Sequence, residues 1–179
     1  MSKSLIASTH WQWLADRELN WCLRLNRASE RLIVERLFAS VSRLGDGVFW
    51  YTLMLTLPLI LGAEALPVVG HMVVTGALCL LLYKGLKSKT IRPRPCDCNR
   101  SIRTTVPPLD QYSFPSGHTL HAVGFSVIVV FYYPQLSWLV IPFTLLVALS
   151  RLVLGLHFPS DVLAGATLGG SIASLVLLF

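Results

Sequence analysis

Charged side chains are scarce in this sequence. Only 13% of its 179 residues are Asp, Glu, Lys or Arg and 54% are hydrophobic, whereas an average soluble domain contains roughly 25% charged residues. This composition excludes a disordered chain, which needs high charge and few apolar residues. With only four cysteines, a small disulfide-rich scaffold is excluded as well. We therefore expect a single domain, residues 1–179, embedded in a lipid bilayer.

Long apolar runs account for most of the sequence. A helix needs about 20 apolar residues to cross a bilayer, with roughly 17 to 25 tolerated, and five segments come close to this length. They comprise residues 47–63, 66–83, 118–133, 136–155 and 160–179. The predicted fold is all-α: a polytopic membrane helix bundle with about five transmembrane helices in residues 47–179. No cleavable signal peptide is expected, because no uninterrupted apolar run precedes Asp16.

The first 46 residues are different, because they hold seven Lys or Arg and five Asp or Glu, too many for a span. Apolar residues at helical spacing predict one amphipathic helix over residues 11–25 and a second over residues 34–41. Both helices are expected to lie in the membrane interface. Three tryptophans would anchor the first of them: Trp11, Trp13 and Trp21. Amphipathic helices that simply pack on the bundle would show the same pattern.

The connection between the second and third spans is unusually long. Residues 84–117 include seven Lys or Arg, two Asp and five prolines. Loops of this length inside a compact domain are usually functional or disordered. We expect a catalytic loop, because the polar residues in it form specific clusters.

Three polar clusters are expected on one face of the membrane. With five spans, the long loop and the junction at residues 151–161 emerge on the same side. The clusters are Lys87 to Pro95, Pro115 to His118, and Ser150 to Asp161. Ionisable residues at the membrane edge are energetically costly, so each cluster is a functional candidate.

Together the clusters hold the groups that metal-free phosphoryl transfer requires. Fixed cations and hydrogen-bond donors must hold the equatorial phosphate oxygens, and arginine offers a planar fork that suits them. The candidate cations are Lys87, Arg94 and Arg151. Further donors are the hydroxyl of Ser116 and the backbone N–H groups of Gly117 and His118, at the amino-terminal end of a helix. This chemistry needs no metal and no cofactor.

Two histidines would perform the remaining chemistry. One neutral imidazole attacks phosphorus, and the other, protonated, donates a proton to the leaving group. Asp161 follows His157 by four residues, so on one helical turn its carboxylate could hold the far imidazole nitrogen. This spacing predicts His157 as the nucleophile, Asp161 as its partner and His118 as the general acid.

The same residues form three motifs. Six residues separate Lys87 from Arg94-Pro95, and Pro115-Ser116-Gly117-His118 follows. Five residues then separate Ser150-Arg151 from His157, and three more separate His157 from Asp161. In this order and without a substitution, the motifs resemble the tripartite signature of the type 2 phosphatidic acid phosphatase superfamily. The resemblance implies a metal-independent phosphatase with a phosphohistidine intermediate. It implies a phosphate pocket of Lys87, Arg94, Ser116, Gly117 and Arg151, and a catalytic set of His118, His157 and Asp161.

The resemblance also implies a substrate class. Members of the superfamily dephosphorylate lipids such as phosphatidic acid, phosphatidylglycerophosphate and undecaprenyl pyrophosphate, so we expect a lipid phosphatase of a bacterial-type cell membrane. Two alternatives stay open: a lipid phosphotransferase, and a non-catalytic scaffold that binds or transports lipid phosphates. The expected partners are the substrate and the surrounding lipids. Nucleic acid is not expected, because the basic loop lacks interleaved aromatic residues, and the sequence does not indicate an oligomeric state.

Other readings of single residues are weaker. His118 and His121 are three apart, but two histidines without a nearby Cys or Glu set are poor evidence for zinc. Cys96 and Cys98 are separated by one residue, so a disulfide between them would be strained, and free thiols are expected. Arg92 could steer an anionic headgroup, but contact with solvent or lipid phosphates is expected.

The charge distribution predicts a cytoplasmic active face. Under the five-span topology all 15 Lys and Arg lie on the active side, and the opposite side keeps only Glu64. The positive-inside rule places such a face in the cytoplasm. Superfamily members that recycle undecaprenyl pyrophosphate work on the outer face, so the expected side and one expected substrate conflict. A sixth span would reverse the prediction.

Overall fold

A computed structural model describes residues 8–108 and 110–179, with side chains from Asp16 onward. Helices make up the regular structure of these residues, and none of them forms a β-strand. The all-α prediction is therefore confirmed. The predicted anchors Trp11 and Trp13 lie outside the described side chains.

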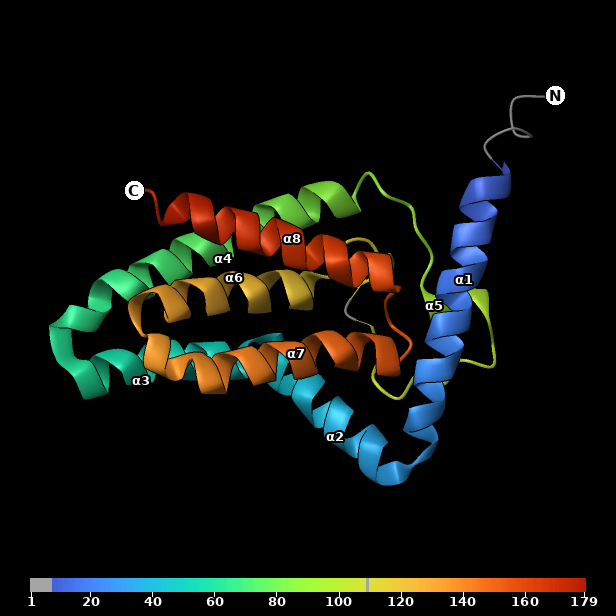
Figure 1. Ribbon diagram of the computed structural model, residues 1–179, viewed down its shortest axis with the longest axis horizontal. Helices are drawn as coiled ribbons and strands as arrows, with labels where there is room; N and C mark the ends of the chain where they lie inside the picture. The colour runs from blue at the N-terminus through green and yellow to red at the C-terminus, as the bar shows by residue number, and fades with distance from the viewer. Residues whose placement is uncertain (1–7, 109) are drawn as a thin grey trace.

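Five helices lie side by side and form the bundle (Figure 1). They are α3 (Phe49–Leu61), α4 (Leu66–Lys87), α6 (Gly117–Tyr132), α7 (Ser137–Val153) and α8 (Pro159–Val176). Each coincides with one of the predicted apolar segments, because an uninterrupted apolar run can satisfy its backbone only within a helix and bury its side chains against neighbouring helices. The central helix α6 packs against α4, α7 and α8.

Two glycines allow α8 to approach α6 closely. A Cβ atom at Gly169 would lie 2.1 Å from the carbonyl oxygen of Leu120, and one at Gly165 would lie 2.5 Å from that of Ser116. Small residues at a helix interface permit such an approach of two backbones. The contact is completed by the backbone N–H of Ser116, which donates to the carbonyl oxygen of Asp161 at 3.0 Å. The start of α6 is thereby held against the start of α8.

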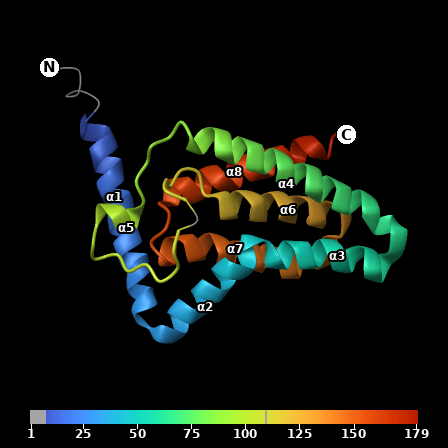
Figure 2. The ribbon, with the colours of Figure 1, turned by 180° about the vertical axis from the view of Figure 1, so that it is seen from behind.

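The amino-terminal segment covers one end of the bundle. It consists of α1 (Ser8–Asn26), the 3₁₀ turn η1 (Arg27–Glu30), α2 (Leu32–Arg43) and the π-helical turn η2 (Leu44–Val48). In Figures 1 and 2, α1 crosses this end at a steep angle and α2 leads back obliquely to α3. Asn26 docks α1, because its Nδ2 donates to the carbonyl oxygens of Arg103 and Val153 at 2.9 and 2.8 Å. Both predicted amphipathic helices are present and pack on the bundle. Trp21 and Ile33 are exposed and could contact lipid, so an interfacial position stays a prediction.

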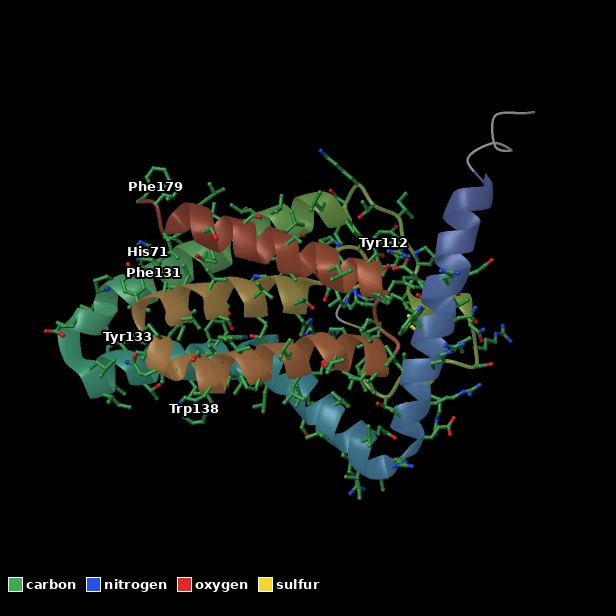
Figure 3. All side chains as sticks on the ribbon, viewed as in Figure 1. His71, Tyr112, Phe131, Tyr133, Trp138 and Phe179 are labelled. Atoms are coloured by element: carbon green, nitrogen blue, oxygen red, sulfur yellow. The ribbon has the colours of Figure 1, made fainter. Side chains whose placement is uncertain are left out.

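Apolar length and aromatic placement fit a membrane. Among the described residues, the helical stretch Leu32–Lys87 and the stretch Pro134–Val153 are long and apolar enough to span, and Gly117–Tyr132 is a shorter apolar helix. The exposed aromatic residues Phe131 and Trp138 lie toward the end of the bundle opposite α1 (Figure 3). Aromatic side chains favour the membrane–water interface, so this end fits the second interface. The number of spans stays a prediction.

The loop begins later than the sequence predicts. α4 continues to Lys87, past the predicted span end at Tyr83, because no proline interrupts it and lysines in a last helical turn interact favourably with the helix dipole. Within the loop, Pro95–Cys98 forms the short helix α5. Lys87 is therefore carried by a long helix and not by the loop.

Candidate active site

All three predicted clusters lie at the α1 end of the bundle (Figure 2). Arg151 is in the last turn of α7, and Asp161 is in the first turn of α8. The others, in chain order, are Lys87 at the end of α4, Arg94 before α5, Ser116 before α6, Gly117 and His118 in its first turn, and His157 between α7 and α8. The structure thus brings together every residue that the sequence singled out.

Lys87 and Arg94 form a clamp around the carboxylate of Asp110. Arg94 Nη2 donates to Asp110 Oδ1 at 2.5 Å, and Arg94 Nε donates to the Asp110 carbonyl oxygen at 3.1 Å. Lys87 Nζ and the Tyr83 hydroxyl contact the other carboxylate oxygen. Burial alone would raise the pKa of Asp110, but the hydrogen bonds from Lys87 and Tyr83 outweigh it and lower the pKa. The clamp therefore holds a charged oxyanion.

Arg151 is a buried cation with few partners. Its side chain is 2% exposed, its Nη1 donates to Ser42 Oγ at 2.5 Å, and its Nε has no hydrogen-bond partner among the described residues. A buried charge without a countercharge is costly. A phosphate ligand would supply both the negative charge and an acceptor for Nε.

His157 lies beside the clamp with one ring nitrogen toward it. Arg94 Nη1 lies 3.3 Å from His157 Nε2, and a guanidinium can only donate, so the neutral ring carries its proton on Nδ1. Burial and then the positive charges of Arg151 and Arg94 lower the pKa of His157 well below 6.5. The imidazole is therefore neutral at neutral pH, with the Nε2 lone pair toward the cations.

Asp161 holds the other side of His157. Its Oδ2 lies 3.7 Å from His157 Nδ1 and accepts from the backbone N–H of Phe158 at 2.8 Å. The two side chains are not on one helical turn, because α8 begins at Pro159, a residue suited to the first helical position. The extended residue Phe158 thus brings Asp161 to face His157, but Nδ1 has no hydrogen-bond partner among the described residues, so the predicted pairing stays a prediction.

His118 opens α6 and contacts Asp46. His118 Nε2 and Asp46 Oδ1 are paired, and Asp46 is carried by η2, where Gly47 has φ of 134°. Glycine adopts this backbone conformation without strain, so it allows the chain to bend between α2 and α3. The carboxylate is placed to stabilise a protonated imidazole, the state that a general acid needs.

The remaining predicted groups complete the start of α6. Ser116 Oγ lies 3.0 Å from Thr119 Oγ1, and the first N–H groups of a helix have no intrahelical acceptor. A Cβ atom at Gly117 would lie 2.6 Å from the Tyr83 ring, so glycine lets that ring pack on this turn. His121, the residue of the weak zinc hypothesis, has Nδ1 2.8 Å from the carbonyl oxygen of Gly117.

Sequence reasoning missed several residues here. Asp46, Tyr83 and Asp110 were not singled out, although the flanking glycines Gly45 and Gly47 mark Asp46 as part of a bend. The sequence also did not indicate that Arg92 binds two carboxylates, those of Glu18 and Asp161. These are contacts between distant parts of the chain, which local spacing does not encode.

The cysteine prediction has a clear outcome. Cys96 and Cys98 are free, and the second of them is exposed. No disulfide joins them across the single intervening residue, in line with the strain that such a bridge would carry.

A mostly apolar groove opens beside His118. Its volume is about 460 Å³, and residues of η2, α3, α4 and α6 line it. Asp46, His118 and Tyr83 are among its polar lining residues, and Trp50 and Ala77 are among the apolar ones. The groove can take an apolar chain whose polar end lies beside His118.

Three curated proteins with enzyme names are similar to part of the chain. The undecaprenyl-diphosphatase BcrC of Bacillus subtilis is 32% identical over 90 residues, which cover 50% of this chain and 46% of the relative. An undecaprenyl-diphosphatase of Sulfolobus acidocaldarius is 30% identical over 105 residues, 58% of this chain and 51% of the relative. A decaprenylphosphoryl-5-phosphoribose phosphatase of Mycobacterium tuberculosis is 31% identical over 93 residues, which cover 51% of this chain and 49% of the relative. The chain therefore spans about half the length of the curated relatives it matches.

Two crystal structures share the fold. LpxE of Aquifex aeolicus superposes with a TM-score of 0.79 over 90% of this chain and 94% of that chain, at 23% sequence identity. A transmembrane PAP2-type phosphatidylglycerolphosphate phosphatase of Bacillus subtilis superposes with a TM-score of 0.76. The match covers 93% of this chain and 85% of that chain, also at 23% sequence identity. The apolar helices and these neighbours together show an integral membrane fold.

A sequence profile decides the family. Residues 64–179 match the PAP2 superfamily, and this range contains all the predicted phosphate-binding and catalytic residues from Lys87 to Asp161. With the motifs converging at one end of the helix bundle and the superfamily profile covering most of the chain, this protein belongs to the PAP2 superfamily.

Proposed function

We propose that this protein hydrolyses a phosphomonoester or pyrophosphate of a membrane lipid through a phosphohistidine intermediate, without a metal. One observation carries the proposal: two buried cations, Lys87 and Arg94, hold the carboxylate of Asp110 in the way they would hold a phosphate, and Arg94 Nη1 lies 3.3 Å from the neutral Nε2 of His157. An anion clamp beside a buried, unprotonated nucleophile is what attack on a phosphate requires. Binding alone would need no such histidine.

In the first step, His157 Nε2 attacks the terminal phosphorus. The bond that breaks joins this phosphorus to the lipid oxygen of a phosphomonoester, or to the bridging oxygen of a pyrophosphate. His118, paired with Asp46, gives its proton to the departing oxygen. Asp161 stabilises the positive charge that develops on the His157 ring, since its Oδ2 faces Nδ1. Lys87, Arg94 and Arg151 hold the equatorial oxygens.

In the second step, water attacks the phosphohistidine. Neutral His118 takes a proton from this water, the bond between phosphorus and Nε2 breaks, and inorganic phosphate leaves. Both histidines then return to their starting protonation states.

The groove beside His118 favours a substrate with an apolar chain. Its polar end contains His118 and its apolar walls belong to α3, α4 and α6, so the headgroup can reach the clamp while the chain stays among membrane helices. The names of the curated relatives favour a polyprenyl phosphate or diphosphate. We place the enzyme in a bacterial-type cell membrane, with the active face toward the cytoplasm on the basis of the charge distribution.

A substrate panel in the presence of EDTA tests the function. Purified protein in detergent is given undecaprenyl diphosphate, phosphatidic acid and phosphatidylglycerophosphate, and released phosphate is measured. We expect turnover of at least one lipid at the same rate with and without EDTA, because cationic side chains perform the role of a metal. Loss of activity with EDTA would refute metal independence, and phosphate transfer to a second labelled lipid would indicate a phosphotransferase. Binding without turnover would leave the lipid-phosphate scaffold as the better account.

The groove itself can be tested by filling it. Ala77 is exposed on α4 and lines the groove, so Ala77→Trp should obstruct the lipid chain. We expect the KM for lipid substrates to rise about tenfold, with little change for p-nitrophenyl phosphate, which has no lipid chain. Leu81→Trp is the matched control, since Leu81 is 69% exposed on the same helix and does not line this groove. Equal effects of both variants on lipid turnover would contradict a role for the groove.

A further inference from the structure

Helix α1 reaches the catalytic end through Glu18. Glu18 Oε1 accepts from the backbone N–H of Ser160 at 2.8 Å, and Glu18 Oε2 accepts from Arg92 Nη2 at 2.5 Å. The carboxylate thus ties α1 both to the first turn of α8 and to the loop. Helix α1 lies outside the residues 64–179 that match the superfamily profile.

Arg92 connects Glu18 to the partner of the nucleophile. Its Nη1 donates to Asp161 Oδ1 at 2.6 Å and to Ser160 Oγ at 2.7 Å. Its guanidinium lies 4.2 Å from the centre of the Phe158 ring, a cation–π contact that restricts its rotation. The planar fork of arginine presents Nη1 and Nη2 to two separate carboxylates in a fixed geometry, which the compact ammonium of lysine does not reproduce.

The two oxygens of Asp161 have separate roles. Oδ1 is bound by Arg92, whereas Oδ2 accepts from the Phe158 N–H and faces His157 Nδ1 at 3.7 Å. Asp161 is fully buried, and a buried carboxylate needs a countercharge that stays in place. The orientation of Oδ2 toward His157 therefore depends on Arg92. The orientation of the Arg92 guanidinium depends in turn on Glu18.

We propose that Glu18 and Arg92 are positioning residues that orient Asp161 for its role beside His157, and that α1 is consequently part of the catalytic unit. The inference rests on the hydrolytic function proposed above. Arg92 does not serve as a headgroup ligand here, because both of its terminal nitrogens already bind carboxylates. A displacement of Asp161 by a fraction of an ångström misaligns the nucleophile, and such errors reduce the rate of the chemical step.

The contacts that lead from Glu18 through Arg92 to Asp161 are called the relay below. A double-mutant cycle tests this relay with Glu18→Gln, Arg92→Met and their combination. The glutamine keeps an acceptor for the Ser160 N–H but loses the ion pair. We expect kcat to fall about 10-fold for Glu18→Gln and about 100-fold for Arg92→Met, with KM within about twofold. The double variant should match Arg92→Met, because Glu18 acts through Arg92. Arg92→Lys keeps the positive charge but loses the simultaneous contact with Glu18 and Asp161, so its kcat should resemble that of Glu18→Gln.

Exposed residues of the same segments provide the controls. Glu30→Gln and Arg100→Met change an exposed carboxylate and an exposed guanidinium, and both variants should retain wild-type kcat. Effects of Glu18 and Arg92 that multiply in the double variant would overturn the relay. A rise in KM at unchanged kcat would overturn it too, since Arg92 would then be a substrate ligand.

A measurement without turnover separates the relay from the proposed function. In protein labelled with ¹⁵N-histidine, the Nδ1–H signal of His157 is assigned by its loss in His157→Asn. We expect this signal to shift in Arg92→Met and Glu18→Gln and to stay in place in both controls. A wild-type protein that hydrolyses no lipid phosphate would refute the function, whereas an unshifted signal would refute the relay whatever the substrate.

Discussion

The variant His157→Ala is expected to lose phosphate release by roughly four orders of magnitude or more, the scale seen when a nucleophile is removed. The physical reason is that the neutral imidazole of His157 presents its Nε2 lone pair to the anion clamp, where Nε2 lies 3.3 Å from Arg94 Nη1. The measurement is phosphate release from the best lipid of the panel, with trapping of acid-labile phosphoenzyme from labelled substrate. His118→Ala should also abolish release, because the leaving oxygen then receives no proton.

A histidine at the other end of the bundle is the control. His71 Nδ1 lies 2.8 Å from the carbonyl oxygen of Pro67 and 3.1 Å from the Tyr132 hydroxyl, far from the clamp (Figure 3). His71→Ala should therefore keep its activity. His157→Ala should remain folded in detergent, with an elution profile like that of the wild type. Substantial hydrolysis by folded His157→Ala would refute its assignment as the nucleophile.

The variant Gly169→Ala is expected to give the largest loss of stability from a single added methyl group. Its Cβ would lie 2.1 Å from the carbonyl oxygen of Leu120 and 2.9 Å from the carbonyl carbon, and a helix backbone cannot move aside as a flexible side chain does. Overpacking costs about 1–3 kcal/mol, while alanine regains at most about 1 kcal/mol of helix propensity. We expect the melting temperature in detergent to fall by several degrees. Activity should fall too, because α6 carries His118.

The neighbouring glycine tests this explanation directly. A Cβ atom at Gly170 would lie 3.7 Å from Val123 Cγ1, an ordinary contact. Gly170→Ala should therefore leave the melting temperature unchanged or raise it slightly through helix propensity. If both variants melted alike, the close approach of α6 and α8 would not be the cause.

The sequence was sufficient to predict the helices of the bundle and to single out candidate phosphate-binding and catalytic residues that gather at one end of it, but not Asp46, Tyr83 or Asp110. Membrane helices are recognisable because each needs a long apolar run, and this requirement is local. The phosphate-binding and catalytic residues stand in contiguous motifs such as Pro115 to His118. Their convergence followed from topology, since two helices between the second and third motifs return the chain to the same end.

Local boundaries were harder to predict. Lys87 belongs to α4 and His157 precedes α8, although spacing alone suggested a loop and a helical turn. A propensity pattern does not show where a helix ends when the next residues could continue it. The pattern of residues 11–25 did not distinguish an interfacial helix from a packed one. The hydrogen bond from Asn26 to Val153 shows packing on the bundle, and lipid contact stays a prediction.

Composition and motif spacing thus identify a membrane protein with phosphate chemistry, because burial in lipid and short-range geometry both leave local patterns. They do not show which carboxylate meets which cation. Asp110 in the clamp, Asp46 on His118 and Glu18 on Arg92 join parts of the chain whose separation is set by helix packing. Such pairs depend on angstrom-scale placement of whole helices, and only the folded bundle places Asp161 between Arg92 and His157.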